Sequence, residues 1–248
     1  IFAIVGLKLQ SELALTNTQY GLLVAVPILT GSLSRLPLGV LAEIYGARLV
    51  MSVLMLVVAC FTFVLPLAKS YAMLLLMGLG LGLAGGAFAV GVVYVSAWFP
   101  PAKQGTALGL FGMGNVGTAV TSLAAPWLLA SMDWQSVVWI YAKVMLASAV
   151  LFYVFSQPVP TTVRSAAHTN WAGHLEPLRS FQVWSFSVYY FLVFGGFVAL
   201  ASWLPRFYIG VYEVDIRTAG LLAASFLIPA TLFRSVGGYL SDRYGARR

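Results

Sequence analysis

The sequence predicts an all-α protein that crosses a lipid bilayer several times. Hydrophobic residues make up 60% of the 248 residues and charged residues only 8%, whereas a soluble globular domain carries about 25% charged residues. Apolar stretches long enough to cross a hydrocarbon core, which takes roughly 20 helical residues, recur along the whole chain. A polytopic membrane protein is therefore expected, because a signal peptide or a single anchor would place one such stretch near one end.

The predicted helices lie between the charges, prolines and glycines that interrupt the apolar pattern. The sixth helix, for example, begins after Asp133, and the eighth begins after Glu213 and Asp215. The first helix starts inside an apolar stretch and is expected to be incomplete. In chain order, the eight predicted spans are 1–9, 19–41, 47–68, 72–98, 104–131, 136–156, 183–209 and 216–240.

One long polar connection, residues 156–180, divides six helices from two. It contains three prolines and both histidines, His168 and His174, which we expect to be solvated loop residues. We expect no metal site, because no acidic cluster lies near these histidines and Cys60 is the single cysteine. Cys60 is predicted to be a small buried hydrophobe, and no cofactor is implied. The predicted organisation is an N-terminal six-helix half (1–156), a linker (157–182) and the start of a second half (183–248).

The distribution of basic residues predicts the topology. The net charge of +7 is scattered over short loops, so it indicates orientation in the bilayer and not a nucleic-acid partner. In the loops on one side of the membrane, carboxylates offset the positive charge. These loops contain Lys8, Lys69, Arg206 and Arg217 together with Glu12, Asp133, Glu213 and Asp215. The positive-inside rule therefore places the other side in the cytoplasm of a plasma-membrane protein, with the linker and Arg48, Lys103, Arg164, Arg179, Arg243, Arg247 and Arg248.

The chain contains one strong internal repeat. The segment "GLLVAVPILTGSLSRLPLGVLAEIYGARL", from Gly21, aligns without gaps on "GLLAASFLIPATLFRSVGGYLSDRYGARR", from Gly220, at a constant offset of 199 residues. If the second and eighth helices are counterparts, the linker separates two six-helix halves and the second half lacks four helices here. The complete protein would then have about twelve, as in secondary transporters whose substrate site lies at the midplane between parallel repeats.

The repeated segment ends in a loop motif through which the chain resembles the major facilitator superfamily. The family motif places a glycine, an acidic residue, a glycine and an arginine in order. The resemblance implies pseudo-symmetric six-helix halves and a cytoplasmic gate, in which the carboxylate pairs with neighbouring arginines and the glycines allow a tight turn. Ordinary charges at helix ends would explain one copy but explain two registered copies poorly. The predicted gate residues are Gly39, Glu43, Gly46 and Arg48, and then Gly238, Asp242, Gly245 and Arg247.

Two arginines, Arg35 and Arg234, occupy equivalent positions inside the second and eighth predicted helices. A cation in the hydrocarbon core costs at least about 2.5–3.5 kcal/mol. Snorkelling towards the headgroups would explain one isolated arginine better than two in register. No acidic residue lies at their depth, so we expect the substrate to be the missing counter-ion. A small planar oxyanion fits, because each guanidinium donates paired hydrogen bonds and keeps its proton.

The fifth helix narrows the resemblance to the nitrate/nitrite porter branch. It reads "GTALGLFGMGNVGTAVTSLAAP", which is similar to the nitrate signature of that branch, and its glycines also suit close helix packing. The seventh-helix run "YYFLVFGGFVALASWLPRFY" carries the same resemblance. By this resemblance Phe88 and Phe194 sandwich the flat anion, Tyr190 donates a hydrogen bond and Asn115 helps to orient it. Taken singly, each aromatic residue is more often lipid-facing or core packing. The signature glycines are Gly105, Gly109, Gly112, Gly114 and Gly117.

The resemblance implies a monomeric carrier of nitrate, nitrite or both that works by alternating access. We expect nitrate/nitrite exchange, because no carboxylate or histidine within the spans would carry a proton. The alternatives are a carrier of another small oxyanion or a carboxylate, a proton-coupled nitrate symporter, and a non-transporting membrane sensor or subunit. An enzyme is not expected, because no nucleophile, base and orienting group gather in the spans. Lys143, in the sixth helix, is expected to snorkel outward, with charge compensation as the alternative.

Overall fold

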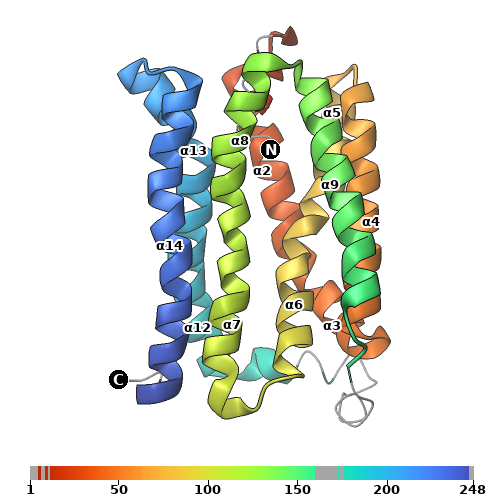
Figure 1. Cartoon of the computed structure of the whole chain (residues 1–248), viewed down its shortest axis with the longest axis vertical. Coiled ribbons are helices and arrows are strands. Elements are labelled where there is room, and N and C mark those ends of the chain that lie inside the picture. The colour runs from red at the N-terminus through yellow and green to blue at the C-terminus, as the bar shows by residue number, and fades with distance from the viewer. Residues whose placement is uncertain (1–4, 7–8, 11, 160–172, 174–175, 246–248) are drawn as a thin grey trace.

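The computed structural model describes residues 5–6, 9–10, 12–159, 173 and 176–245, and its long elements are helices that run side by side (Figure 1). Seven helical segments of the described chain are long and apolar enough to cross a membrane. They confirm the second to eighth predicted spans: Asn17–Tyr45, Ala47–Leu67, Tyr71–Ser96, Pro101–Ser131, Trp134–Phe155, Phe181–Tyr212 and Ile216–Tyr244.

Several spans contain more than one element, because short irregular turns interrupt them. In chain order the elements are α2 (Asn17–Leu33), α3 (Arg35–Tyr45), α4 (Ala47–Val64), η1 (Leu65–Leu67), α5 (Tyr71–Gly82), η2 (Leu83–Gly86), α6 (Ala87–Ser96), η3 (Pro101–Lys103), α7 (Gln104–Gly112), η4 (Met113–Asn115), α8 (Val116–Ser131), α9 (Trp134–Phe155), η5 (Glu176–Arg179), α12 (Phe181–Tyr190), η6 (Phe191–Gly195), α13 (Gly196–Tyr212) and α14 (Ile216–Tyr244).

The first predicted helix and the linker lie largely outside the described residues, as do His168 and His174. Residues 5, 6 and 9 of the first predicted span, and residue 10 just after it, are helical. The side chains of Val5 and Leu9 are buried against the ends of the neighbouring helices.

The two copies of the repeat fold differently at their arginines. The first copy is interrupted at Ser34, between α2 and α3, whereas the second copy is the continuous helix α14. Pro37 contributes to the break, because its ring nitrogen has no hydrogen to donate to the carbonyl of Leu33 one turn earlier, although α14 accommodates Pro229 without interruption. The corresponding residue of the second copy is Val236, which keeps its N–H. Arg35 therefore begins a helix, and Arg234 lies in the middle of one.

Three clusters of buried residues hold the helices together. The largest gathers at the end of the molecule where α5 and α9 begin, around Leu74, Trp134 and Val137. A second cluster, Ala42, Ala47 and Val90, joins α3, α4 and α6 towards the other end. The third connects α8 to α14 through Ala119, Ala224 and Leu227, with Phe197 of α13 packed against it.

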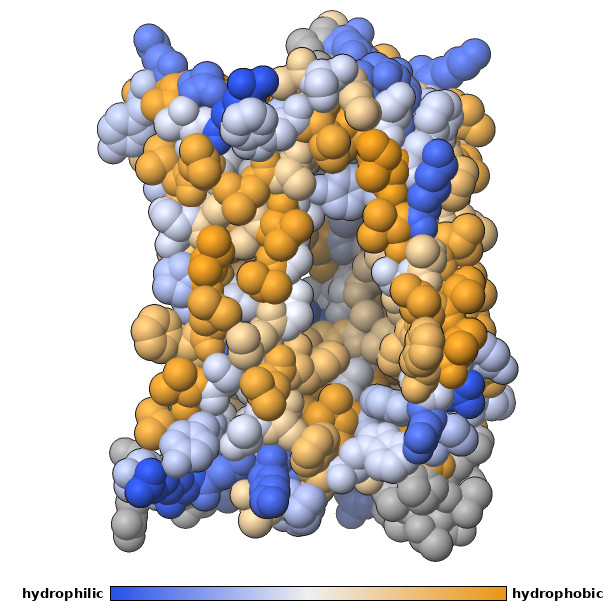
Figure 2. Space-filling view, viewed as in Figure 1, coloured by the Kyte–Doolittle hydropathy of each residue, from blue (hydrophilic) through white to orange (hydrophobic). Residues whose placement is uncertain are grey.

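The outer surface is suited to lipid. Figure 2 shows an apolar band between two more hydrophilic ends, with a hollow in the middle of the visible face, between α8 and α9. Many large apolar side chains, such as Leu151, Val154 and Phe233, are exposed on it, as expected where lipid tails replace water. Cys60 is also exposed, so its predicted burial was wrong. Its helix, α4, is apolar on its outer side as well, so hydrophobicity alone could not separate a lipid-facing position from a core position.

Glycines allow α7 and α14 to approach closely. A Cβ atom at Gly109 would lie 2.7 Å from the carbonyl oxygen of Arg234 and 3.1 Å from the Cα of Ser235. A Cβ atom at Gly105 would meet the carbonyl oxygen of Gly238 at 2.7 Å. These contacts involve backbone atoms, which cannot move aside alone. Three of the signature glycines, Gly105, Gly109 and Gly112, therefore face α14, whereas Gly114 and Gly117 have no atom within 4 Å of their Cβ positions.

Replacing Gly109 by alanine should separate α7 from α14 and destabilise the protein. Overpacking of this kind costs about 1–3 kcal/mol, so the apparent Tm of the detergent-solubilised intact protein should fall by several degrees. Gly117→Ala is the matched control, because its methyl group meets nothing within 4 Å. Equal Tm values for the two variants would contradict close packing at Gly109.

Candidate functional site

The guanidinium of Arg35 is positioned by the backbone of a neighbouring helix. Its Nε donates a hydrogen bond of 3.3 Å to the carbonyl oxygen of Gly85 in η2. This carbonyl lies within reach because α2 and η2 meet through glycines: a Cβ atom at Gly85 would be 2.7 Å from the Cα of Gly31. In the part of the chain that the structure describes, Nε is the one Arg35 donor that forms a hydrogen bond, which leaves the two terminal NH₂ groups for a ligand.

Both arginines face the same aromatic ring. The Cζ atom of Arg35 lies 5.0 Å from the ring centroid of Phe194, and the Cζ atom of Arg234 lies 5.3 Å from it. The two cations, 199 positions apart in the sequence, are therefore brought together at one point of the fold. Both contacts lie within the range of a cation–π attraction.

Phe88 and Tyr190, two of the predicted site residues, complete the aromatic wall around Phe194. The ring of Tyr190 stacks on Phe194, with centroids 4.9 Å apart and planes 15° apart. Phe88, from α6, lies 6.3 Å from Phe194 at an interplanar angle of 26°. A flat molecule between two ring faces needs about 7 Å, twice a van der Waals contact. Phe88 and Phe194 must therefore separate slightly before a planar anion could lie between them.

A wide helical turn carries Phe194. Residues Phe191–Gly195 form the π-helical segment η6 between α12 and α13, a type of distortion that is frequent at functional sites. Tyr190 immediately precedes this turn and Phe194 lies near its end, and their rings still stack. A spacing of four residues predicts a shared face of a regular helix, but nothing in the sequence indicated the wide turn.

Phe197 and Gly112 also lie beside Arg234, and neither was predicted from the sequence to contact it. The Cζ of Arg234 lies 5.3 Å from the ring centroid of Phe197, three residues after Phe194 and therefore on the same side of the helix. A Cβ atom at Gly112 would lie 3.3 Å from the Cδ of Arg234, so this glycine leaves room for the stem of the arginine. The spacing of Phe194 and Phe197 was the available signal for the first neighbour.

Asn115 ends η4, three residues after Gly112. Its side chain is half-buried and forms no hydrogen bond within the described part of the chain. No hydrogen bond joins Asn115 to the aromatic residues in the described part of the chain. Its role as a ligand therefore stays a prediction.

No carboxylate neutralises the two arginines. All seven acidic residues of the chain lie in the described part, and none forms an ion pair or hydrogen bond with Arg35 or Arg234 there. Lys143 does not join the site either: it is exposed on α9, among exposed apolar residues such as Val144 and Leu146. This location fits a lysine that snorkels along the outer surface.

Comparison with known proteins places this architecture in a family. The whole chain, residues 1–248, matches the family model of the Major Facilitator Superfamily. The protein belongs to the Major Facilitator Superfamily. A solved member of the same fold is described as a bacterial homologue of the human lysosomal transporter Spinster, in an inward-facing and occupied conformation. It superposes with a TM-score of 0.69 at 21% identity, over 99% of this chain and 58% of that one.

Curated relatives within the superfamily are more similar in sequence. The chain is 40% identical to the "Probable nitrate/nitrite antiporter NarK1" of Thermus thermophilus, over 100% of this chain and 58% of the relative. It is 33% identical to the "Nitrite extrusion protein" of Bacillus subtilis (strain 168), over 96% of this chain and 59% of the relative. The chain thus spans somewhat less than two thirds of the length of these relatives.

The superfamily loop motif joins different helices in its two copies. In the second copy, the carboxylate of Asp242 accepts hydrogen bonds from the backbone N–H groups of Gly105 and Thr106, at 2.8 and 2.6 Å, and from the Thr106 hydroxyl, at 2.7 Å. Asp242 therefore caps the start of α7, where N–H groups lack helical partners and the helix dipole favours an anion. The expected pairing of this carboxylate with an arginine is replaced by backbone donors.

In the first copy, Arg48 is held within its own half. Its Nη2 donates to the carbonyl oxygen of Tyr153 in α9 at 2.5 Å, and its Cζ lies 4.6 Å from the Tyr153 ring centroid. Glu43 lies on α3, one turn before Gly46, and Gly39 faces Ala89 of α6. Arg247 lies outside the described residues.

Two motif glycines form the sharp turns that the resemblance implied. Gly46 and Gly245 have φ angles of 94° and 83°, in the region that residues with a side chain rarely adopt. Each ends the helix that carries the acidic residue of its copy, α3 and α14.

At the opposite end of the molecule, other side chains connect the first six spans to the last two. Arg206 of α13 donates to Asn17 Oδ1 at 2.8 Å, and its Cζ lies 4.3 Å from the ring centroid of Tyr20. Arg217 of α14 lies 4.5 Å from the Trp127 ring centroid. Contacts between the first six spans and the last two are therefore present towards both ends of the bundle.

Asp242→Asn should loosen the first turn of α7. The amide has one acceptor oxygen where the carboxylate has two, and its NH₂ group opposes the N–H groups of Gly105 and Thr106. Hydrogen bonds to a charged group contribute about 1.5–3 kcal/mol, so amide exchange of these two residues in the intact protein should accelerate roughly ten- to hundredfold. Hydrogen–deuterium exchange read by mass spectrometry would measure this.

Asp215→Asn is the matched control for this measurement. Asp215 also caps a helix, accepting from the N–H groups of Arg217 and Thr218, but the helix is its own, α14. A hydrogen bond from the Thr218 hydroxyl lowers the pKa of Asp215. This variant should leave exchange at the start of α7 unchanged. Unaltered protection of Gly105 and Thr106 in Asp242→Asn would count against the cap.

Proposed function

We propose that the protein transports nitrate, nitrite or both across the plasma membrane by alternating access. The observation that carries the proposal is the approach of Arg35 and Arg234 to the ring of Phe194, with no carboxylate partner for either among the described residues. The names of the relatives in Thermus thermophilus and Bacillus subtilis support nitrate and nitrite as substrates.

The chemistry of the site suits a small flat anion. Two guanidiniums supply planar forks of donors that keep their charge at any physiological pH. The ring faces of Phe88 and Phe194 suit a flat, weakly hydrated anion. In this proposal the side chains of Tyr190 and Asn115 donate hydrogen bonds to the edge of the anion. The anion would supply negative charge beside the two arginines, which lowers the cost of keeping two cations inside the membrane.

Transport by this site requires the two halves to move about the anion. In this proposal residues 1–156 form the N-terminal half, residues 157–182 a cytoplasmic linker, and residues 183–248 the start of the second half. The Asp242 cap on α7 acts as the contact that closes the cytoplasmic end, and the Arg206 contacts with Asn17 and Tyr20 close the opposite end. The protein works as a monomer.

We favour nitrate/nitrite exchange over proton-coupled symport. The spans of this chain contain no histidine, and their carboxylates, Glu43 and Asp242, lie at one end. A permanently charged arginine pair cannot carry a proton, so an outgoing anion is the simpler way to restore the charge of the empty site. The same arginines would also suit another small oxyanion or a carboxylate, which competition against labelled nitrate would reveal.

Arg35→Lys should impair nitrate uptake nearly as much as Arg35→Ala. An ammonium keeps the charge but cannot reproduce the planar pair of donors. Loss of one or two charge-assisted hydrogen bonds, at about 1.5–3 kcal/mol each, should reduce uptake by intact protein in proteoliposomes ten- to hundredfold or more. Lys143→Gln, which removes an exposed positive charge from α9, should transport normally. Near-normal uptake by Arg35→Lys would refute the planar-anion site.

Exchange and symport differ in what drives uptake. Proteoliposomes loaded with nitrite should take up labelled nitrate without a pH gradient, whereas nitrite-free vesicles should take up little. The control is the same preparation with an imposed inward proton gradient. Uptake that depends on the proton gradient and ignores internal nitrite would replace exchange by symport and would leave the anion site intact.

A further inference from the structure

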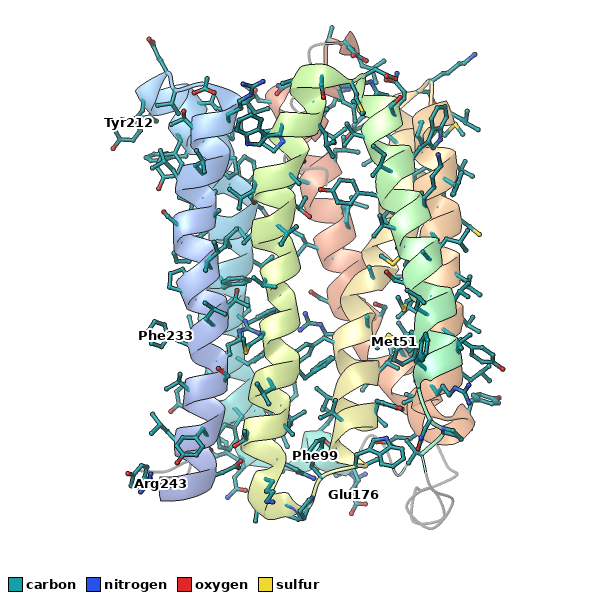
Figure 3. The ribbon with its side chains drawn as sticks, in the orientation of Figure 1. Met51, Phe99, Glu176, Tyr212, Phe233 and Arg243 are labelled. Atoms are coloured by element: carbon teal, nitrogen blue, oxygen red, sulfur yellow. The ribbon has the colours of Figure 1, made fainter. Side chains whose placement is uncertain are left out.

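A groove lies apart from the proposed anion site, at the end of the molecule that the charge pattern predicts to be cytoplasmic. The groove runs between α7 and α14 and has a volume of about 420 Å³. Phe99 and Arg243, which both line it, are labelled at that end of Figure 3. It is distinct from the space around Phe194, because none of the residues proposed to bind the substrate lines it.

The walls of the groove are mainly apolar. Phe99, Ala107, Leu110 and Tyr239 line it, and the side chains of Phe99, Leu110 and Tyr239 are exposed by 45%, 57% and 49%. Leu110 lies seven residues beyond Lys103 on the same span, which corresponds to about 10 Å along a helix axis. The groove therefore extends from the end of the bundle into the apolar band of the surface.

Positive charge gathers where the groove reaches the end of the bundle. Lys103 and Arg243 both line it and both are exposed. The single lining carboxylate, Asp242, is already engaged with Gly105 and Thr106 and does not pair with either base. Arg243 receives its orientation from the hydroxyl of Tyr239, to which its Nη1 donates at 3.1 Å.

We propose that this groove binds an anionic phospholipid of the inner leaflet. Lys103 and Arg243 bind the headgroup phosphate, and one acyl chain lies along Phe99, Leu110 and Tyr239. The apolar length of the groove favours a lipid over a free anion, because a small hydrated ion gains nothing from these walls. The basic mouth favours an anionic headgroup over a zwitterionic one.

Bound lipid would contact both sides of the Asp242 cap. Lys103 immediately precedes α7, and Arg243 follows Asp242 on α14. A phosphate between the two bases would hold α7 against α14 and favour the state in which Asp242 caps α7. Lipid binding therefore adds regulation at the gate and does not require nitrate to be the substrate.

Native mass spectrometry of the intact protein tests the site. The purified protein is mixed with dioleoyl phosphatidylglycerol or with dioleoyl phosphatidylcholine, and the bound lipid is counted. Wild-type protein should retain phosphatidylglycerol in preference to phosphatidylcholine. The double variant Lys103→Gln with Arg243→Gln should retain phosphatidylglycerol roughly ten- to thirtyfold less, because each basic residue near a lipid surface contributes about a factor of five.

Three further variants distinguish the groove from a general effect of charge. Lys69→Gln with Lys143→Gln removes two exposed positive charges elsewhere and should retain lipid like the wild type. The double variant Lys103→Arg with Arg243→Lys, which keeps both positive charges, should also retain phosphatidylglycerol like the wild type. Leu110→Trp keeps both basic residues but fills the groove, so it should no longer retain phosphatidylglycerol. The proposal would be overturned if the double glutamine variant retained as much phosphatidylglycerol as the wild type. It would also be overturned if wild-type protein retained the two lipids equally.

Discussion

The structure depends on the placement of two cations in a membrane, with no carboxylate partner for either in the described part of the chain. Arg35 and Arg234 are accommodated by several weaker contacts: the carbonyl of Gly85, the faces of Phe194 and Phe197, and the space left by Gly112. The carbonyl and the ring faces attract a positive charge without cancelling it. In the proposed transporter such a site would still attract an anion, whereas a buried aspartate would neutralise the arginines and occupy the place proposed for the substrate.

One helix, α14, carries both Arg234 and the Asp242 carboxylate that caps α7. Arg234 and Asp242 are eight residues apart on α14, which is about 12 Å of continuous helix. A rotation of α14 that moved Arg234 relative to Arg35 would also move Asp242 relative to the start of α7. In the proposed transport cycle, binding at Arg234 and release of the Asp242 cap would thus be related through one rigid helix, without a chain of intermediate side chains. The close glycine contacts between α7 and α14 give this element a defined surface to move against.

Much of this arrangement could be predicted from the sequence, because hydrophobic length and an ungapped repeat are strong signals. They located seven spans to within a few residues and placed Arg35 and Arg234 at equivalent depths. What could not be predicted depends on tertiary contact: the hydrogen bond from Arg35 to Gly85, the preference of Asp242 for backbone donors, and the exposure of Cys60. The break before Arg35 had a visible cause, Pro37, but symmetry with α14 argued against it. In a lipid-facing protein, moreover, apolar residues occur on both the inner and the outer side of each helix, so hydrophobicity does not identify the core.

The wide turn at Phe191–Gly195 lets the seventh span absorb a change in its own length. A π-helical turn accommodates one residue more than a regular α-helix over the same rise. Deleting one residue of this turn before Phe194 would therefore let the span become a regular helix without rotating α12 relative to α13. Tyr190 and Phe194 would then be three residues apart and would still share the face beside Arg35. A one-residue deletion within the regular helix α13 has no such outlet, because it would rotate the segments on its two sides by about 100° relative to each other.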